Sequence, residues 1–280
     1  MAKRWFIRKH LQAGIKQAVL ILASVVALYP VFWLVATAFK DNAQYRENIF
    51  FFSWPLKYTS FIQSVTQGKF GLWFTNSFIL TFGSVLICTV IALFAAFAFA
   101  HMRFRGKDFL FNVLISIMVI PVVILIVPLF ILFIRTKLMA THIGLIIIYS
   151  AVTLPFSVYL LTNFFKTSPV EMLEAGIIDG CSNLKILTRI ILPISGPPIA
   201  TLIVVNALWV WNELLLALVF LPKDNLRTLM VGITVFKNKF NLDIPVTMAG
   251  LLITTLPMVV LYIIFQKFFI RGLTAGSVKG

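Results

Sequence analysis

The chain has 280 residues, of which 60% are hydrophobic and 12% charged, and its formal net charge is +15. No water-soluble domain can bury that much apolar side chain, so the composition excludes a soluble globular protein. In a soluble chain the basic excess would suggest nucleic acid. Here the basic residues stand between long apolar runs, where they orient the chain and contact anionic lipid headgroups. No nucleic-acid partner is expected.

Charge-free runs long enough to cross a bilayer, about 20 residues, predict the membrane spans. In chain order the predicted spans are 17–39, 70–102, 109–134, 138–165, about 198–221, and 244–266. Several contain proline, which membrane helices tolerate because neighbouring groups satisfy the freed backbone. The predicted fold class is therefore all-α, a polytopic membrane protein with six transmembrane helices and both termini on one side.

The N-terminal segment, residues 1–16, mixes basic and aromatic residues and predicts an interfacial helix. The apolar stretch after it is too long for a signal-peptide core, which favours a retained first span. Lysine and arginine number 14 on the side that holds this segment, the turn 101–107, the polar segment between spans four and five and the C-terminal tail, and 10 on the other side. The positive-inside rule then predicts that both termini, and the polar segment between spans four and five, are cytoplasmic.

That polar segment, residues 167–180, holds three of the nine acidic residues: Glu171, Glu174 and Asp179. Ser168 stands directly before Pro169 and three residues before Glu171, which predicts a helix N-cap with a capping box. The segment is therefore expected to begin a helix.

Asp179 and Gly180 predict the end of this first helix, because glycine readily adopts the left-handed conformation. Ser182 is the expected cap of a second helix, residues 183–192, that ends at Pro193. The result is a helix-turn-helix. Along its first helix Met172, Ala175 and Ile178 share one face, which either packs under the chain's own membrane domain or enters a groove in a soluble partner.

These residues carry a resemblance. Glu174-Ala175-Gly176, Asp179-Gly180 and Ile191-Leu192-Pro193 resemble the EAA loop of ABC-importer permeases, in its spacing as well. Trp211-Asn212-Glu213 resembles the W-N-D signature of the carbohydrate branch, and residues 265–280 are similar to the tail of the maltose-type second permease. Gly176 replaces the family's second alanine, and Glu213 replaces its aspartate.

The resemblance implies a permease domain over 17–270, with a cytoplasmic EAA coupling loop over 167–193 and a cytoplasmic tail over 271–280. In the family this loop docks in a cleft of an ATP-binding subunit. The residues carried over for that contact are Glu174, Ala175, Gly176, Asp179 and Gly180, with Glu174 meeting a basic residue. The tail residues carried over to the ATPase dimer interface are Ser277, Val278, Lys279 and Gly280.

The chain contains no phosphate-binding loop of the G-x-x-x-x-G-K-[ST] type. The expectation is therefore a non-catalytic transport subunit without a cofactor or metal of its own, with ATP and Mg bound by two partner ATPase subunits. The resemblance further implies a second, different permease, an extracytoplasmic solute-binding protein and import of sugars or oligosaccharides. The expected location is the cell membrane of a bacterium or archaeon.

Glu213 is the one Asp, Glu, Lys or Arg inside a predicted span, where an acid requires a partner or a wet cavity. Asn76, Trp211, Asn212 and Glu213 are the candidate pathway residues. A structural hydrogen bond for Glu213, helix capping or packing for Asn76, and interface anchoring for the tryptophan remain the alternatives.

Other functional classes fit less well. An ion-coupled secondary transporter would be expected to carry further intramembrane charges and an internal repeat. A membrane enzyme would be expected to cluster carboxylates or histidines, and His10, His101 and His142 are scattered. An importer for another polar solute stays open.

Overall fold

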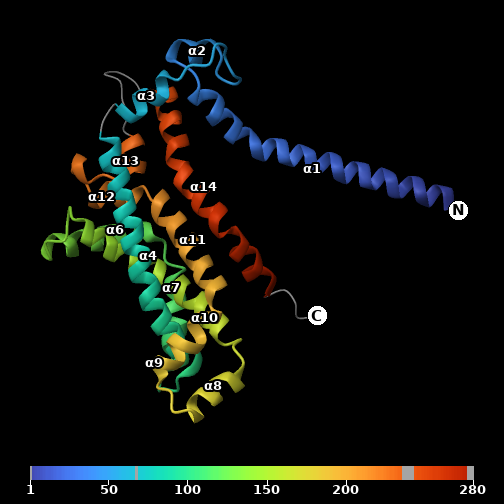
Figure 1. Cartoon of the computed structure of the whole chain (residues 1–280). Helices are drawn as coiled ribbons and strands as arrows, with labels where there is room; N and C mark the ends of the chain where they lie inside the picture. The colour runs from blue at the N-terminus through green and yellow to red at the C-terminus, as the bar shows by residue number, and fades with distance from the viewer. Residues whose placement is uncertain (1, 67–68, 235–242, 276–280) are drawn as a thin grey trace. The chain divides into compact units, whose positions relative to one another are not determined.

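A computed structural model of the chain describes residues 2–66, 69–234 and 243–275, and the side chains within 14–66, 69–234 and 243–266. Within those ranges it consists of helices joined by loops (Figure 1), so the all-α prediction is confirmed. The chain divides into two compact units. The first comprises Met1–Gly68 and Ile233–Ile253, and the second comprises Lys69–Gly232 and Thr254–Gly280.

The described helices, in chain order, are α1 (Ala2–Ala38), α2 (Asn42–Glu47), α3 (Thr59–Thr66), α4 (Phe70–His101), α5 (Lys107–Ile117), α6 (Val122–Arg135), α7 (His142–Phe165), α8 (Val170–Ile178), α9 (Asn183–Ile186), the π-helical turn η1 (Leu187–Ile191), α10 (Leu192–Ile194), α11 (Gly196–Asn212), α12 (Leu215–Phe220), the 3₁₀ turn η2 (Asp224–Leu226), α13 (Leu229–Thr234) and α14 (Ile244–Ala275).

Four of these helices contain an unbroken stretch that is long and apolar enough to cross a membrane: Gly14–Ala38, Phe70–His101, His142–Phe165 and Ile244–Gln266. They match predicted spans one, two, four and six. Two further candidates are bent pairs of helices, α5 with α6 at 98° and the α9–α10 segment with α11 at 81°. The described part of the chain therefore has six spans if each bent pair counts as one.

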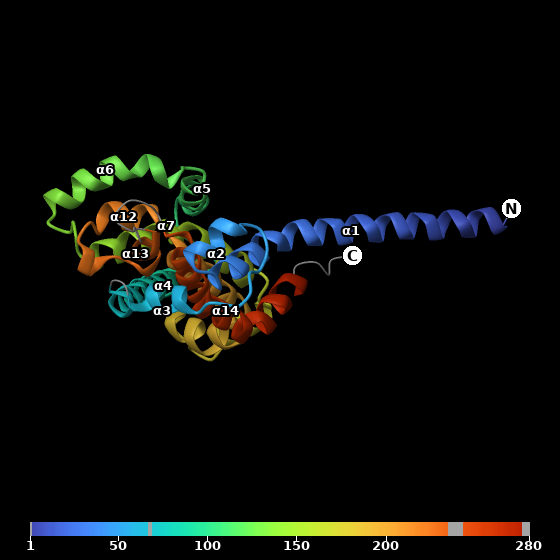
Figure 2. The ribbon, with the colours of Figure 1, turned by 90° about the horizontal axis from the view of Figure 1, so that it is seen from above.

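The bends have local causes in the sequence. Pro121 precedes α6 in an extended conformation, and its ring cannot supply the N–H that would continue α5. Figure 2 shows α5 and α6 meeting at this corner. The second corner falls at Ser195, where Gly196 and two prolines open α11. Predicted span three is thus a bent element, because proline breaks the helix inside an otherwise continuous apolar run.

In the first unit, α1 runs without interruption from Ala2 to Ala38. Residues 1–16 were expected to form an interfacial helix, and from Ala2 onwards they are the first turns of the same helix as span one. Their place at the membrane surface stays a prediction. Gly14 is the only poor helix former among them, and one glycine costs only about 1 kcal/mol.

In the second unit, α4 and α7 pack along their lengths with α11 beside them. Small residues at the contacts allow the close approach of helix backbones that is common in membranes. One buried cluster gathers residues of α4, α7 and α11 with the segment that follows α8: Ala92, Ala96, Phe97, Val158, Leu161, Phe165, Ile186, Leu187, Ile191 and Leu202. This cluster connects the polar segment to the membrane helices.

Candidate functional site

The predicted helix-turn-helix is present, and its turn follows the predicted chemistry. Gly180 has φ +73°, in the left-handed region, and its N–H donates to the Ile177 carbonyl at 3.0 Å. Ser182 caps the second helix, where its Oγ accepts from the Lys185 N–H at 3.4 Å. We call the segment from α8 through α10, residues 170–194, the hairpin. Its turn was predictable because the signals are local.

The start of α8 differs from the prediction. Pro169, not Ser168, occupies the N-cap position, and no side chain caps the helix there. Ser168 lies in the turn after α7, where its N–H donates to the Phe165 carbonyl at 3.1 Å, and its buried Oγ has no partner among the described residues. The capping-box prediction is therefore wrong, although Glu171 does lie in the first turn, where a negative charge is favoured.

The second helix also runs further than predicted. It passes Pro193 and ends at Ile194, because the π-helical turn Leu187–Ile191 precedes the proline. A π-type turn re-spaces the backbone hydrogen bonds, and single turns of this kind often mark functional regions. The expected stop at Pro193 is therefore wrong by one residue.

One side of the hairpin packs on the chain itself. Gly176 is buried, and a Cβ placed there would lie 2.7 Å from Ile190 Cδ1. Ile186 and Ile191 are buried in the cluster that contains Phe165 of α7. The glycine in place of alanine therefore allows close contact between the two arms of the hairpin.

The other side of α8 is open. Met172 and Ala175 are exposed, and Ile178 has 85% of its surface exposed, so the described residues leave the face predicted from the sequence uncovered. Glu174 and Asp179 are exposed beside it, as is Glu171. None of these carboxylates forms an ion pair with a described residue. The result is an apolar face with acidic flanks at the end of α7 and α11.

Glu213 lies at a break between α11 and α12, and its carboxylate is fully engaged. Oε1 accepts from the Leu216 N–H at 2.7 Å, and Oε2 accepts from the Ala217 N–H at 3.0 Å and the Tyr149 hydroxyl at 2.7 Å. The break exposes N–H groups that no helical carbonyl reaches, and the acid satisfies them. Tyr149 of α7 was not among the predicted site residues, because nothing near Glu213 in the sequence points to it.

A second polar contact joins α7 to α11 nearer the hairpin. Asn206 Nδ2 donates to Ser157 Oγ at 2.8 Å, and the Ser157 hydroxyl donates to the Thr153 carbonyl at 2.8 Å. Cys88 of α4 contacts the same hydroxyl, with 3.2 Å between Sγ and Oγ. Both helices that flank the hairpin are therefore linked twice, at Ser157–Asn206 and at Tyr149–Glu213.

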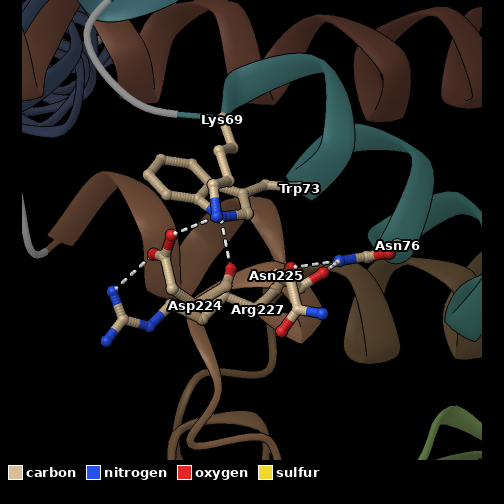
Figure 3. A network of polar contacts seen from close by, with 6 residues as sticks. All are labelled: Lys69, Trp73, Asn76, Asp224, Asn225 and Arg227. Atoms are coloured by element: carbon tan, nitrogen blue, oxygen red, sulfur yellow. Dashed lines mark hydrogen bonds and ion pairs between the residues drawn. The ribbon is translucent and has the colours of Figure 1, made fainter.

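Asn76 is buried on α4 and holds the turn after α12 in place. Its Nδ2 donates to the carbonyls of Asn225 and Arg227, each at 3.0 Å (Figure 3). Beside it, Trp73 Nε1 donates to the Asp224 carbonyl at 2.9 Å. The Asp224 carboxylate pairs with Lys69 at 3.1 Å and with Arg227 at 3.0 Å. This is the packing alternative considered for Asn76, and its pathway role stays a prediction.

The remaining predicted residues are Trp211, Asn212 and the four residues of the C-terminal tail. Trp211 is buried, donates from Nε1 to the Thr254 carbonyl at 3.0 Å and packs edge-on against Phe74. Asn212 is exposed, and its Nδ2 donates to the Leu208 carbonyl of its own helix. Ser277, Val278, Lys279 and Gly280 lie outside the described residues.

Residues 88–274 match the family described as the binding-protein-dependent transport system inner membrane component. This range includes α7, the hairpin, and the α11–α12 break. The chain belongs to that family.

Individual relatives agree over nearly the whole chain. The probable ABC transporter permease protein YurM of Bacillus subtilis is 32% identical over 93% of this chain and 87% of its own length. The arabinooligosaccharides transport system permease protein AraQ of Halalkalibacterium halodurans is 31% identical over 91% of this chain and 92% of its own. The melibiose/raffinose/stachyose import permease protein MelC of Bacillus subtilis is 32% identical over 93% and 95%.

A solved structure shares the fold. It is a chain from the crystal structure of a bacterial ABC transporter involved in the import of the acidic polysaccharide alginate. The TM-score is 0.81 at 21% sequence identity, with 94% of this chain and 98% of that chain covered. The predicted fold of an ABC-importer permease is thereby confirmed, and this protein is a multi-pass membrane transport subunit.

Proposed function

We propose that this chain forms one half of the pathway of an ATP-driven importer for sugars or oligosaccharides, together with a second, different permease. The relatives AraQ and MelC are named for oligosaccharide transport, and that supports this substrate class. An extracytoplasmic solute-binding protein delivers the sugar. Both termini and the hairpin lie in the cytoplasm, in line with the clusters of basic residues.

The observation that carries the proposal is the uncovered face of α8. An exposed apolar face flanked by carboxylates, on a short helix beyond the spans, fits insertion into a groove of a soluble partner. That partner is an ATP-binding subunit, which holds the ATP and Mg. The contact residues are Glu174, Ala175, Gly176, Asp179 and Gly180. Gly176 is buried, and it contributes by letting the two arms of the hairpin pack closely.

Movement of the docked hairpin reaches the pathway through the two helices that flank it. Phe165 at the end of α7 and Ile191 before α11 are both fully buried in one cluster, so the hairpin cannot shift without these helices. The Ser157–Asn206 and Tyr149–Glu213 hydrogen bonds then link α7 to α11, and the pair moves together. Packed elements with polar links transmit displacement as units.

The test is charge reversal at Glu174, with Asp108 as the matched control. Both are exposed acids, but Asp108 lies outside the hairpin, in the first turn of α5. Glu174→Lys should abolish co-purification of the ATPase subunits and transport while leaving membrane insertion intact. Asp108→Lys should retain both. Full transport and ATPase association by Glu174→Lys would refute the docking role.

The substrate class needs a separate measurement. The complex reconstituted with its solute-binding protein should take up labelled oligosaccharides when ATP is supplied, and should not respond to an imposed ion gradient. Uptake of a different polar solute in place of sugars would refute the carbohydrate assignment but would agree with the proposal that the complex is an ATP-driven importer.

A further inference from the structure

After α1 and the short helix α2, the chain turns back along the end of α1. We call residues 49–54 the aromatic loop. Trp33 Nε1 donates to the Ile49 carbonyl at 3.0 Å, and the rings of Phe32 and Phe52 meet edge-on at 5.4 Å. Trp33 lies five residues before the end of α1, which is about 7.5 Å along the axis at 1.5 Å per residue. The aromatic loop therefore lies beside the last turns of a candidate membrane span (Figure 1).

The side chains on the outside of the aromatic loop are large and apolar. Phe50 is 58% exposed, Phe51 63% and Trp54 80%. Tryptophan concentrates at the boundary between headgroups and acyl chains, because its ring is largely apolar but carries an N–H. Phenylalanine occurs on the apolar face of elements that lie in this boundary. These three residues would expose a costly surface if they faced only water.

Part of the backbone of the aromatic loop is paired with side chains that adjoin it. Asn48 Oδ1 accepts from the N–H groups of Phe50 and Phe51, both at 3.1 Å. The Asn48 carbonyl accepts from the buried Lys40 Nζ at 2.6 Å, and Trp33 serves the Ile49 carbonyl. In an apolar phase each unpaired backbone group costs several kcal/mol, so paired polar groups beneath exposed rings suit a segment that enters the membrane interface.

We propose that the aromatic loop is a lipid anchor, in which Phe50, Phe51 and Trp54 insert into the interface of the leaflet at the C-terminal end of α1. Interfacial elements bury about 5–10 Å into that boundary, which is the depth that the contact with Trp33 gives the loop. A surface for a soluble protein would project beyond the helix end, whereas this loop doubles back along it. The anchor does not depend on the proposed ATPase contact.

The experiment uses the whole complex in phosphatidylcholine vesicles. Trp54→Cys in a Cys181→Ser background is labelled with an environment-sensitive fluorophore, and lipids spin-labelled at a shallow or a deep acyl position act as quenchers. Cys88 is buried and stays as it is. Glu47→Cys, at an exposed position of α2, is the matched control. Intrinsic fluorescence of the parent and of Trp54→Phe, with brominated lipid, gives a second measurement without a new cysteine.

The expected result is quenching at position 54 that is severalfold larger than at position 47, strongest with the shallow quencher. In the intrinsic measurement the lipid-quenched signal should fall when Trp54 is replaced. The proposal is overturned if positions 54 and 47 are quenched equally. It is also overturned if the probe at position 54 reports water until the solute-binding protein is added, because that would make the loop a protein-docking surface.

Discussion

Truncating Glu213 tests how the break between α11 and α12 is held. Glu213→Ala removes three acceptor contacts and leaves the Tyr149 hydroxyl, whose residue is fully buried, without a partner. A buried group left unsatisfied costs about 1–3 kcal/mol. Loss of a helix cap costs roughly 0.5–2 kcal/mol. Together the two losses predict a destabilisation of about 1.5–5 kcal/mol.

Two milder variants separate the contributions. Glu213→Asp, which restores the family's residue, should keep the cap but draw the carboxylate away from Tyr149, at a cost of about 1 kcal/mol. Glu213→Gln keeps the length but offers one acceptor oxygen, and its NH₂ would face an N–H donor. The expected destabilisation therefore increases from Glu213→Asp to Glu213→Gln and is largest for Glu213→Ala.

The assay is the free energy of unfolding in mixed micelles, with transport measured on the same preparations. A double-mutant cycle with Tyr149→Phe isolates the hydroxyl–carboxylate contact, for which about 1.5–3 kcal/mol of coupling is expected for a hydrogen bond to a charged group. Additivity of Tyr149→Phe and Glu213→Ala would refute the reasoning, as would a loss of transport by Glu213→Ala without any loss of stability.

Three further changes test other parts of the molecule. Gly176→Ala should shift hairpin stability by less than about 1 kcal/mol, since the gain in helix propensity opposes displacement of Ile190 Cδ1, whereas Gly176→Leu should open the hairpin to limited proteolysis. Gly180→Ala should cost about 1–2 kcal/mol in the same assay, because an alanine is strained at this positive φ although its Cβ would meet no other atom. Gly180→Asn should cost less, because asparagine tolerates the left-handed conformation better. Burial lowers the pKa of Lys40, so the unfolded chain binds more protons between the lowered pKa and the ordinary value of 10.5. Thermal stability should therefore rise with pH across that window, and Lys40→Met should remove this slope.

The spans and the hairpin turn were predictable from the sequence because their causes are local. Bilayer thickness sets the length of an apolar run, and the chemistry of Gly180 and Ser182 acts on neighbouring backbone. The sequence signals at Ser168 are equally local, but the capping box predicted there is absent. The Ser168 N–H donates to the Phe165 carbonyl three residues earlier, so a competing local turn after α7 takes the place of the cap, and α8 begins only after Pro169. The sequence shows that Pro121 interrupts span three, but it does not give the angle between α5 and α6.

The contacts of the intramembrane polar residues could not be predicted, because each partner is distant in the chain. Glu213 accepts from a tyrosine 64 positions earlier, and Asn76 donates to a carbonyl 149 positions later. In both cases a side chain satisfies backbone or hydroxyl groups at a place where a helix ends. A polar group bound in this way is not available to a passing solute unless the break itself rearranges. Asn212 is different, since its side chain is exposed and bonds only to its own helix among the described residues. Within Trp211-Asn212-Glu213, Asn212 is therefore the residue that we would expect to contact a solute. Glu213 fixes the position of the helix end that carries it.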